Sequence, residues 1–463
     1  MGEGATGERG PRDHSGGVAL EAYGTAAVRA DGTHAIAGRA TAPAARLLRW
    51  PGLADAGVLA PRNRRAGPAL ARLGVEELIS LCERMDLRGR GGAGFPLARK
   101  LRAVQEASRV HGRAPHVVAN GEEGEPASVK DRVLLSLCPD LVLDGATVVG
   151  RALAAERIHL YVSDPCCRRI VTERVELRGE SPAMEVFAAP SGYVCGEETA
   201  VVRALSGGPA KPTAKPPRPF EHGVRGRPTL VSNVETLAQL ADAVRRGAAA
   251  PPWSGPEPGS TVLLTVVTDH GERTLVEAPA DVDLRSVLER LALWPATGQP
   301  QVILGGFFGG FATPDCFTTP LRHQAMRAAG SSLGCGIVMV LTDTCPVTAV
   351  AEILHYLDRE NAHQCGPCFR GIAAMLGGVE ALTAGSATAQ TVEQLRSWSV
   401  SLRGRGACGT LDAAAGLLAG LLTEHHVLVA AHLDTACGRC AAAPDRLPAT
   451  RWAASWPIDL EEY

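Results

Sequence analysis

Residues 115–126, PHVVANGEEGEP, combine a short apolar run with a loop of glycines and carboxylates. Residues 115–119 have the pattern of a buried strand, and loops at the carboxyl ends of strands are where α/β sheets bind ligands. Glu122, Glu123 and Glu125 would repel phosphate, but they can accept hydrogen bonds from the hydroxyl groups of a ribityl or ribose chain. The loop therefore predicts a binding site, and a solvated acidic turn stays open as the alternative.

Helical and strand patterns alternate around this loop, between about residues 70 and 245. Residues 73–81 have the pattern of a helix, and residues 158–162 form a second apolar strand. Between the two strands, one helical face collects Leu141, Val148, Val149 and Ala152. Alternation of this kind predicts a layered α/β domain.

A second loop, RGRGGAGFP at residues 88–96, is dense in glycine. Glycines let the main chain come close to a ligand and turn successive N–H groups toward an anion. Arg88, Arg90 and, farther on, Lys100 add positive charge to this loop. It is not a P-loop, because no Gly-Lys-Ser/Thr closes it.

A third loop, SGYVCGEET at residues 191–199, again combines glycine, carboxylate and an aromatic ring. Lys215 with two prolines and the stretch SNVET at 232–236 follow it. Residues 246–260 then read as a linker, since proline and glycine crowd together and periodicity disappears.

The remaining chain divides into two patterns. Residues 262–267 and 274–277 bracket a turn, and a short helix at 286–291 and an apolar run at 302–304 follow, which predicts a small β-grasp-like unit. From about residue 346, three apolar stripes at helical spacing predict a small helical bundle. Residues 1–65 show no sustained periodicity, and we expect much of that stretch to be poorly ordered.

Composition narrows the class of protein. The 463 residues are 45% hydrophobic, so a wholly disordered chain is excluded, and 47 Lys and Arg nearly balance 49 Asp and Glu. This balance gives no general electrostatic case for nucleic acid or for an anionic membrane. The first residues lack the apolar core of a signal peptide, and no apolar run is long enough for a membrane helix. We therefore expect a soluble, cytoplasmic protein without direct membrane insertion.

The 13 cysteines favour reduced thiols over a disulfide framework, because they are scattered and odd in number. Cys345 and several other single cysteines are expected in the core, and the Cys166-Cys167 pair in a loop. Two pairs stand at ligand spacing, Cys365/Cys368 and Cys437/Cys440, and Cys408 lies in a glycine-rich turn. His425, His426 and His432 are expected to be surface or packing residues.

Together these segments resemble, in order and spacing, the flavoprotein (51-kDa-type) subunit of respiratory NADH dehydrogenase and its relatives in NAD-linked hydrogenases and formate dehydrogenases. The resemblance runs from about Leu73 to about His432. It is carried by GRGGAGFP, NGEEGEP, GYVCGEETA, KPP and NVET, which are highly specific as a set. In that family an FMN domain receives hydride from NADH, and an SLBB module and a helical bundle with a four-iron cluster follow.

The resemblance implies a domain order and site residues for this chain. The domains would be a poorly ordered segment at 1–65, an FMN- and nicotinamide-binding α/β domain at 66–247, an SLBB-like β-grasp module at 260–330, a helical iron–sulfur domain at 345–436 and a tail at 437–463. The cofactor-binding residues would be Gly91, Gly92, Gly94, Phe95, Lys100, Asn120, Glu122, Glu123, Glu125, Gly196, Glu197, Glu198, Lys215, Asn233 and Thr236. Within this set, Lys100 would reach the flavin and Glu198 a ribose hydroxyl.

Some positions depart from the family pattern at the nicotinamide side. Arg218 stands where a phenylalanine is usual, and Leu101 and Arg102 stand where aromatic residues are expected. Lost rings weaken stacking on adenine, by about 1–3 kcal/mol each. Arginine can also stack or pair with a 2′-phosphate, so NADPH as well as NADH is a candidate donor.

The cluster site departs as well, because Ala362 occupies the position of the first cysteine. Cys365, Cys368 and Cys408 remain as ligands of a [4Fe-4S] cluster, each near an expected helix start, where thiolates are stabilised. The fourth ligand could be His363, Cys437 or Cys440, or a water or small thiol on an open iron. Zinc held by both Cys-x-x-Cys pairs, or purely structural thiols, are the alternatives.

The sequence thus predicts an oxidoreductase subunit that passes hydride from NAD(P)H to FMN and single electrons through a [4Fe-4S] cluster to a partner. That partner would be a protein with further iron–sulfur centres. No catalytic His or Ser constellation is required, since the cofactors carry the redox chemistry. The alternative is a non-catalytic or NADPH-specific homologue with an incomplete cluster that acts as a binding or scaffold subunit.

Overall fold

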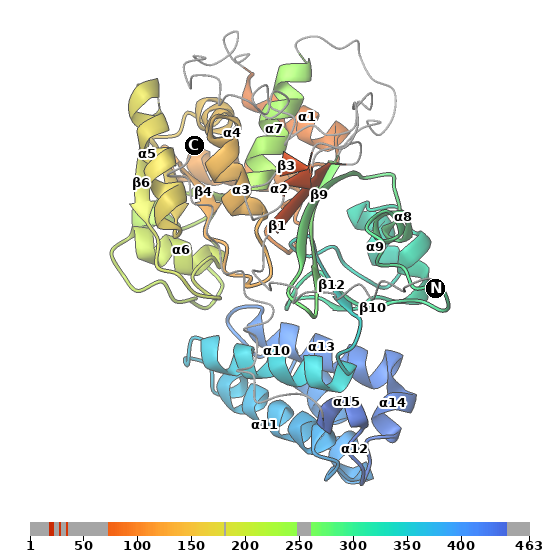
Figure 1. Cartoon of the computed structure of the whole chain (residues 1–463). Helices are drawn as coiled ribbons and strands as arrows, with labels where there is room; N and C mark the ends of the chain where they lie inside the picture. The colour runs from red at the N-terminus through yellow and green to blue at the C-terminus, as the bar shows by residue number, and fades with distance from the viewer. Residues whose placement is uncertain are drawn as a thin grey trace, which may run out of the picture.

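The computed structural model describes residues 18–22, 27–28, 34–35, 73–179, 182–247 and 261–441. Two larger sheets flanked by helices lie side by side, and a bundle of helices lies beneath them (Figure 1). Apart from three short strands, the expectation for residues 1–65 falls outside the described residues, as does that for the tail beyond residue 441. The predicted linker also lies outside them from residue 248 onward.

The first sheet has four parallel strands in the order β6-β5-β4-β7. They are β4 (His116–Gly121), β5 (Arg157–Val162), β6 (Ala183–Ala188) and β7 (Thr229–Asn233). Val117, Val118 and Ala119 in β4 are all fully buried, so both faces of this strand are covered. A parallel strand covered on both faces reads as a continuous apolar run, which is why β4 could be predicted from the sequence.

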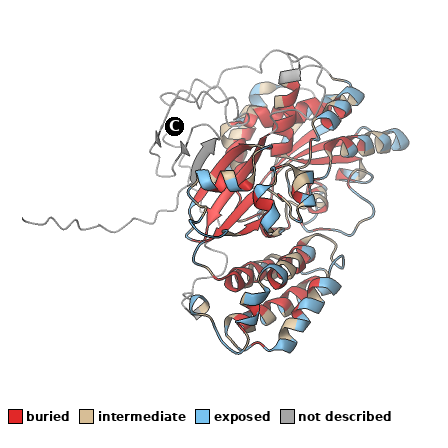
Figure 2. Cartoon of the chain, turned by 90° about the vertical axis from the view of Figure 1, so that its right-hand side faces the viewer, coloured by how far each residue is buried: buried red, intermediate tan, exposed pale blue. Residues whose placement is uncertain are grey.

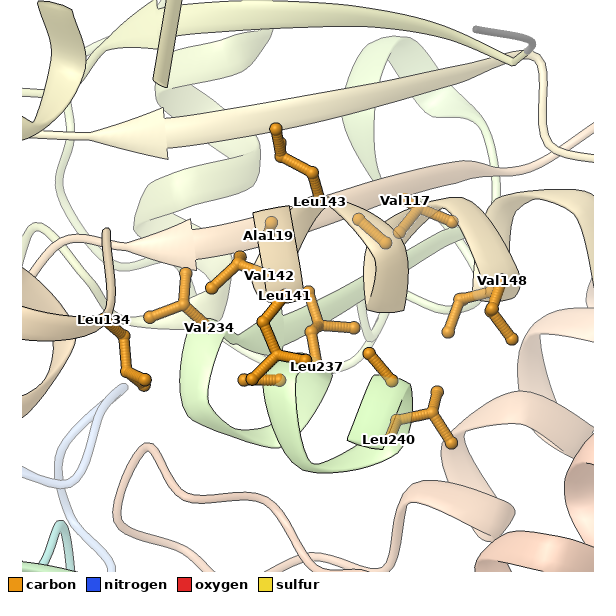
Figure 3. Close-up of a cluster of buried hydrophobic side chains, with 14 of the residues drawn as sticks. Val117, Ala119, Leu134, Leu141, Val142, Leu143, Val148, Val234, Leu237 and Leu240 are labelled. Atoms are coloured by element: carbon orange, nitrogen blue, oxygen red, sulfur yellow. The ribbon is translucent and has the colours of Figure 1, made fainter. Parts of the chain in front are cut away.

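Helices cover both faces of this sheet. They are α1 (Val75–Arg84), α2 (Leu97–His111), α3 (Lys130–Leu137), α4 (Pro139–Ala152), α5 (Pro165–Arg178), α6 (Glu198–Leu205), the 3-10 helix η1 (Val224–Gly226) and α7 (Val234–Gly247). Val117 and Ala119 pack with α3, α4 and α7, while Val118 packs with α6 on the other face (Figure 3). The predicted α/β class is confirmed.

Helices α4 and α7 approach each other most closely at Gly145. A Cβ atom there would lie only 2.0 Å from the carbonyl oxygen of Leu237. Any side chain at this position would push α7 away from α4, and α7 begins directly after β7. The close contact therefore holds the start of α7, a part of the site described below, against the core.

The second sheet has six strands in the order β1-β9-β8-β12-β10-β11. They are β1 (Val18–Ala22), β8 (Thr261–Thr268), β9 (Arg273–Pro279), β10 (Gln301–Leu304), β11 (Gly310–Phe311) and β12 (Ile337–Leu341). The hairpin β8–β9 is antiparallel, and β12 pairs in parallel with β8 in the middle of the sheet. The sheet therefore extends past residue 330, where the predicted module ends. Two further strands, β2 (Ala27–Val28) and β3 (His34–Ala35), form a separate pair.

Three short helices accompany this sheet, α8 (Leu284–Arg290), η2 (Pro314–Thr318) and α9 (His323–Ala328). The helical bundle then consists of α10 (Pro346–Glu360), α11 (Gly366–Thr383), α12 (Ala389–Ser401), α13 (Thr410–Glu424), α14 (His426–Ala430) and α15 (Gly438–Ala441). Buried residues line the inward faces of these helices (Figure 2). The predicted apolar stripes are these faces, so the helical C-terminal region is confirmed.

No single helix among the described residues is long and apolar enough to cross a membrane. The pair α3 and α4, bent by 94°, would pass by length and composition together. Most residues of both helices are buried in the core of the first sheet.

Candidate functional site

The predicted ligand loops meet at the carboxyl ends of the strands of the four-stranded sheet. Strands β5 and β6 lie on one side of β4, and β7 lies on the other, so the chain changes direction between β4 and β7. Asn120 at the end of β4 pairs in register with Asn233 at the end of β7. The carboxyl ends of strands at such a switch point form the crevice where open α/β sheets bind ligands.

The glycine loop 88–96 lies across the junction of β7 and α7. The Gly89 N–H donates to the Phe95 carbonyl oxygen over 2.9 Å, and the Arg90 N–H donates to Thr236 Oγ1 over 2.9 Å. Gly92 has a φ of +117°, and a Cβ there would meet nothing within 4 Å. The main chain at Gly92 therefore faces open space.

Gly94 closes the same loop against the second sheet. Its φ is +60°, and a Cβ there would lie 1.9 Å from Cε1 of His323, the first residue of α9. A side chain at this position would have to displace the His323 ring. His323 was not predicted from the sequence, since nothing local marks a residue that packs on a loop more than 200 positions away.

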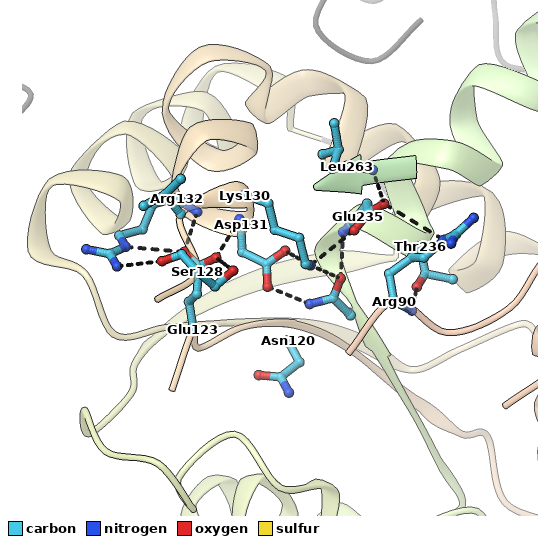
Figure 4. Close-up of polar contacts among 12 residues, drawn as sticks. Arg90, Asn120, Glu123, Ser128, Lys130, Asp131, Arg132, Glu235, Thr236 and Leu263 are labelled. Atoms are coloured by element: carbon cyan, nitrogen blue, oxygen red, sulfur yellow. Dashed lines mark hydrogen bonds and ion pairs between the residues drawn. The ribbon is translucent and has the colours of Figure 1, made fainter. Parts of the chain in front are cut away.

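A buried network of ion pairs and hydrogen bonds lies next to the carboxyl ends of β4 and β7 (Figure 4). Lys130 Nζ lies 2.6 Å from an Asp131 oxygen and 3.2 Å from a Glu235 oxygen. The Asn233 amide donates to Asp131 over 2.6 Å and accepts from Lys130 over 3.2 Å. Burial raises the pKa of Asp131 to about 6, although Lys130 opposes the shift. Asn233 is thus engaged by its neighbours and supports the site instead of offering a free side chain.

Glu123 is engaged in a similar way at the start of α3 (Figure 4). Its carboxylate accepts hydrogen bonds from the Ser128 hydroxyl at 2.5 Å and from the backbone N–H groups of Asp131 and Arg132 at 3.0 and 3.1 Å. The Arg132 guanidinium adds a contact at 3.2 Å. The side chain therefore anchors the helix N-terminus and the loop, whereas the sequence assigned it to the ligand.

Glu122 differs, because one of its oxygens is left without a partner. The side chain is buried, and Oε1 accepts from the Gly192 N–H over 3.3 Å. Oε2 has no hydrogen-bond partner among the described residues, and a Cβ on Gly196 would lie 2.6 Å from it. Burial raises the pKa of Glu122 to about 8. A buried acceptor without a partner, reached past glycines, marks a place for a ligand hydroxyl or N–H group.

The 191–199 loop joins this group, as predicted. The Asn120 side-chain amide donates to the Gly196 carbonyl oxygen over 2.8 Å. Glu197 caps α6 by accepting from the backbone N–H groups of Thr199 and Ala200. The cap fixes the direction in which Glu198, the next residue, leaves the loop.

Two lysines converge on Glu197 and Glu198. Lys215 Nζ lies 2.7 Å from Glu197 Oε1 and 3.2 Å from Glu198 Oε1. Lys100 Nζ lies 3.7 Å from Glu198 Oε2 and donates to the Val231 carbonyl oxygen of β7 over 2.9 Å. Burial lowers the pKa of Lys100, and the neighbouring Glu198 works against that change. This cluster places cationic and anionic groups together beside the β7 end of the crevice.

The positions that depart from the family pattern lie apart from each other. Arg102 forms an ion pair with Glu83 of α1 at 2.5 Å. Arg218 is exposed and close enough to Glu198 to lower the pKa of that carboxyl, after Lys100 and Lys215. Of the two arginines, Arg218 is therefore the one whose charge reaches a predicted nucleotide-binding residue. The predicted ring, Phe95, is 40% exposed and has the Arg99 guanidinium 5.6 Å from its centroid.

Glu125 reaches across to the second sheet. Its carboxylate accepts two contacts from the Phe307 N–H, at 2.7 and 3.1 Å, and lies 2.9 Å from where a Cβ of Gly306 would stand. Burial raises the pKa of Glu125 to about 8. The side chain thus joins the ligand loop to the loop 305–310 instead of pointing to an open face.

This burial predicts a pH dependence of stability that Glu125→Gln should weaken. The carboxyl has a pKa of about 8 in the native chain and about 4.5 in the unfolded chain. Between these values the native state keeps a proton that the unfolded chain releases, so stability falls as pH rises through this window. Glutamine does not titrate. In this variant the slope of unfolding free energy against pH, measured by thermal melting across the window, should therefore be shallower by the equivalent of about one proton. The exposed Glu289→Gln should keep the wild-type slope, and an unchanged slope in Glu125→Gln would contradict the assignment.

An aromatic group that the sequence did not predict backs the 191–199 loop. Tyr193 stacks on Phe308 with centroids 5.1 Å apart and meets Phe307 and Tyr356 edge-on or tilted. The Tyr193 hydroxyl is buried and has no partner among the described residues. The only local signal is the run GGFFGG at 305–310, whose glycines would have indicated a tight approach.

The three predicted cluster cysteines meet at two helix starts in the bundle. Cys365 precedes α11, Cys368 lies in its first turn, and Cys408 lies two residues before α13. The Ala407 N–H donates to Cys365 Sγ over 3.4 Å, and Cys408 Sγ lies 3.3 Å from Thr410 Oγ1. Burial raises the pKa of Cys368 to about 12, and the nearby Cys408 and Cys365 add to the shift.

The other candidate ligands lie in different places. His363 is exposed beside Ala362, whose carbonyl oxygen accepts from Lys211 over 3.1 Å. Cys437 and Cys440 do not join Cys365 and Cys368. They gather with Cys345 and the fully buried His432. The alternative of one zinc site built from both Cys-x-x-Cys pairs is therefore wrong.

Comparisons with known proteins agree with this organisation. A family model described as the Nuo51 FMN-binding domain matches residues 82–242, and one described as the NADH-ubiquinone oxidoreductase-F iron-sulfur binding region matches residues 348–432. The NADH-quinone oxidoreductase F subunit numbered 2 in Rhizobium meliloti (strain 1021) is 29% identical over 79% of this chain and 91% of its own length. The NADH-quinone oxidoreductase F subunit of Mycobacterium tuberculosis (strain ATCC 25618 / H37Rv) is 28% identical over 78% of this chain and 85% of its own.

A solved structure gives the same result. An NAD⁺-reducing [NiFe]-hydrogenase in the H₂-reduced state matches with a TM-score of 0.66 and 29% identity. The match covers 78% of this chain but only 62% of the hydrogenase chain. Fold, site and sequence thus agree: the chain matches both the FMN-binding and the iron–sulfur regions of the flavoprotein F subunits of NADH-quinone oxidoreductases.

Proposed function

We propose that this chain oxidises a reduced nicotinamide with FMN held at the β4–β7 edge and passes the electrons on through an iron–sulfur cluster. The observation that carries the proposal is the open main chain at Gly92 together with the unpartnered, buried Oε2 of Glu122. The free carboxyl oxygen suits the hydroxyl groups of a polyhydroxylated ligand, and the open main chain of the glycine loop suits a phosphate. The family match at residues 82–242 supports the same cofactor.

The residues present fit FMN, and they divide into two groups. Those that line the crevice would contact it: the main chain at Gly91 and Gly92, and the side chains of Lys100, Asn120, Glu122 and Glu198, of which Lys100, Asn120 and Glu198 also have partners within the chain. The others would hold the crevice in shape: Gly94, Glu123, Glu125, Gly196, Glu197, Lys215, Asn233 and Thr236. When bound, FMN accepts a hydride and gives up electrons one at a time, while the protein supplies position and electrostatics.

The chain's own groups give the crevice its electrostatic character. Lys100 and Lys215 place two ammonium groups beside Glu197 and Glu198. The two carboxylates balance these charges, so the lysines would act on a dinucleotide as local hydrogen-bond donors to its phosphates and not through a net positive field. Glu198, held between the lysines, offers an acceptor for a ribose hydroxyl, and the exposed ring of Phe95 offers a face for stacking.

In this proposal, Arg218 determines whether the chain prefers NADPH or NADH as its donor. The guanidinium is exposed beside Glu198 and can pair with the 2′-phosphate that distinguishes NADPH from NADH. Arg218→Phe should lower the rate of flavin bleaching by NADPH relative to NADH by about tenfold, the equivalent of about 1.4 kcal/mol. Arg102→Phe, at the ion pair with α1, should leave the ratio unchanged. Equal ratios in the wild type and in Arg218→Phe would overturn the assignment.

The second and third units complete the electron route in this proposal. The strand order of β8, β9, β10 and β12 supports an SLBB-like β-grasp module, which we extend from 260–330 to residue 341. Along the chain, the module follows the FMN unit and precedes the bundle. In the bundle, Cys365, Cys368 and Cys408 would hold three irons of a [4Fe-4S] cluster, so one iron takes a ligand other than a cysteine of the 362–368 loop. Relatives are subunits of larger enzymes, and we propose a redox partner protein that receives the electrons.

The deciding experiment measures flavin and iron in anaerobically purified protein and then adds NADH or NADPH. The expected result is yellow protein with one flavin per chain, about four irons per cluster, and bleaching by one of the two donors. Folded but colourless protein that refuses FMN on reconstitution would overturn the proposal. It would favour the alternative of a non-catalytic binding subunit.

A further inference from the structure

Four ligand side chains meet at the C-terminal end of the bundle, away from the cysteines assigned to iron. Cys345 precedes α10, His432 follows α14, and Cys437 and Cys440 stand at either end of the turn that forms α15. Their ligand atoms all lie within 4.8 Å of one another. His432 is fully buried and Cys345 nearly so, although the sequence suggested no special role for either.

The spacing fits a single metal ion. His432 Nε2 lies 3.3 Å from Cys440 Sγ and 3.5 Å from Cys345 Sγ. Ligands bonded to one tetrahedral zinc at about 2.0–2.3 Å stand about 3.3–3.8 Å apart. In a [4Fe-4S] cluster each cysteine binds a different iron, so the sulfurs lie farther from one another.

Supporting hydrogen bonds already orient two of the ligands. His432 Nδ1 lies 2.7 Å from the Leu428 carbonyl oxygen, so Nδ1–H donates there and Nε2 is left to bind a metal. This is the arrangement usual for zinc-binding histidines. The Cys440 N–H lies 3.4 Å from Cys437 Sγ and would stabilise a thiolate on that residue.

We propose that Cys345, His432, Cys437 and Cys440 form a structural zinc site of the Cys₃His type, separate from the iron–sulfur ligands. All four positions are filled by protein, which is typical of a structural site and not of a catalytic one. The ion would join Cys345 at the end of the β-grasp sheet to a segment about 90 residues later. It would thereby fasten the segment 426–441 to the first helix of the bundle.

The test measures zinc and iron in the purified full-length chain by mass spectrometry. The wild type should hold one zinc per chain. The double variant Cys437→Ser/Cys440→Ser should lose the zinc and keep the iron, and Cys365→Ser/Cys368→Ser should do the reverse. His432→Gln should lose zinc, whereas the exposed neighbour His426→Gln should retain it.

A second measurement covers variants that fail to fold. Cobalt(II) added alone to the metal-depleted wild-type chain should give the sulfur-to-cobalt charge-transfer and tetrahedral ligand-field bands of a thiolate site. Three results would overturn the proposal: a wild type without zinc and without these bands, loss of iron in place of zinc from the Cys437/Cys440 variant, or a disulfide within the group in the freshly purified chain. Because none of these readings depends on flavin, failure here is distinct from failure of the proposed function.

Discussion

Gly94→Ala should leave the purified chain almost free of flavin. The new Cβ would stand 1.9 Å from the His323 ring, and the residue would also have to keep a φ of +60°. The His323 ring must turn away, or α9 or the glycine loop must move, and the positive φ strains the loop in each case and so disturbs the main chain at Gly92. Strain of about 1–3 kcal/mol at such a position corresponds to a loss of affinity of roughly tenfold to a hundredfold. The measurement is flavin per chain after FMN reconstitution.

Gly112→Ala provides a matched control for this variant. Gly112 ends α2 with the same φ of +60°, but a Cβ there meets nothing within 4 Å. The Gly112→Ala variant should have a slightly lower free energy of unfolding and an unchanged flavin content. The double variant Gly94→Ala/His323→Ala removes the ring and should recover part of the flavin. If Gly94→Ala binds FMN as well as Gly112→Ala does, the loop is not the cofactor site.

Cys368→Ser should abolish the iron signal in electron paramagnetic resonance and leave flavin content and its reduction by the nicotinamide intact. Cys368 lies in the first turn of α11, is 7% exposed, and is near enough to Cys408 and Cys365 for both to raise its pKa further, after burial. With Ala362 at the fourth position, the cluster has no spare cysteine in this loop, and losing one of three thiolates should remove it entirely. Iron per chain and the resonance spectrum are the measurements.

Cys166→Ser is the comparison for that variant. Cys166 lies in the first turn of α5, on the α/β domain and far along the chain from the cluster region. It should keep both cofactors. Loss of flavin together with iron in Cys368→Ser would mean that the bundle holds the α/β domain together, and intact iron would remove Cys368 from the ligand set.

Buried strands and loops with strong local patterns could be predicted from the sequence. The apolar run 116–119 became β4, because that pattern is set by neighbouring residues. The turns of the glycine loop are likewise marked by its own residues, but its place beside the end of β7 depends on Thr236, 146 positions farther along the chain. Helix α5 was missed although Asp164 and Pro165 form an N-cap and a first-turn proline, because few of its residues are buried. Cys166 and Cys167 consequently lie in a helix and not in the predicted loop.

Roles that depend on distant packing could not be predicted. Glu123 resembles a ligand residue in the sequence, yet its partners are Ser128 and the first residues of α3, which reach it only once the loop has folded back on itself. The approach of His432 to Cys345 depends on how α10 and α14 pack across the bundle. The spacing of these residues along the chain does not indicate such contacts.

The hydrogen bond from Phe307 to Glu125 and the contact of His323 with Gly94 have a consequence for engineering. Both partners on the far side belong to residues 261–341, the unit with the second sheet. An α/β unit moved alone into another protein would lose the Phe307 N–H that donates to Glu125 and the His323 ring that packs against Gly94. The α/β unit should therefore not keep its loop structure when it is moved alone, and a chimera would need to include the chain as far as the end of β12.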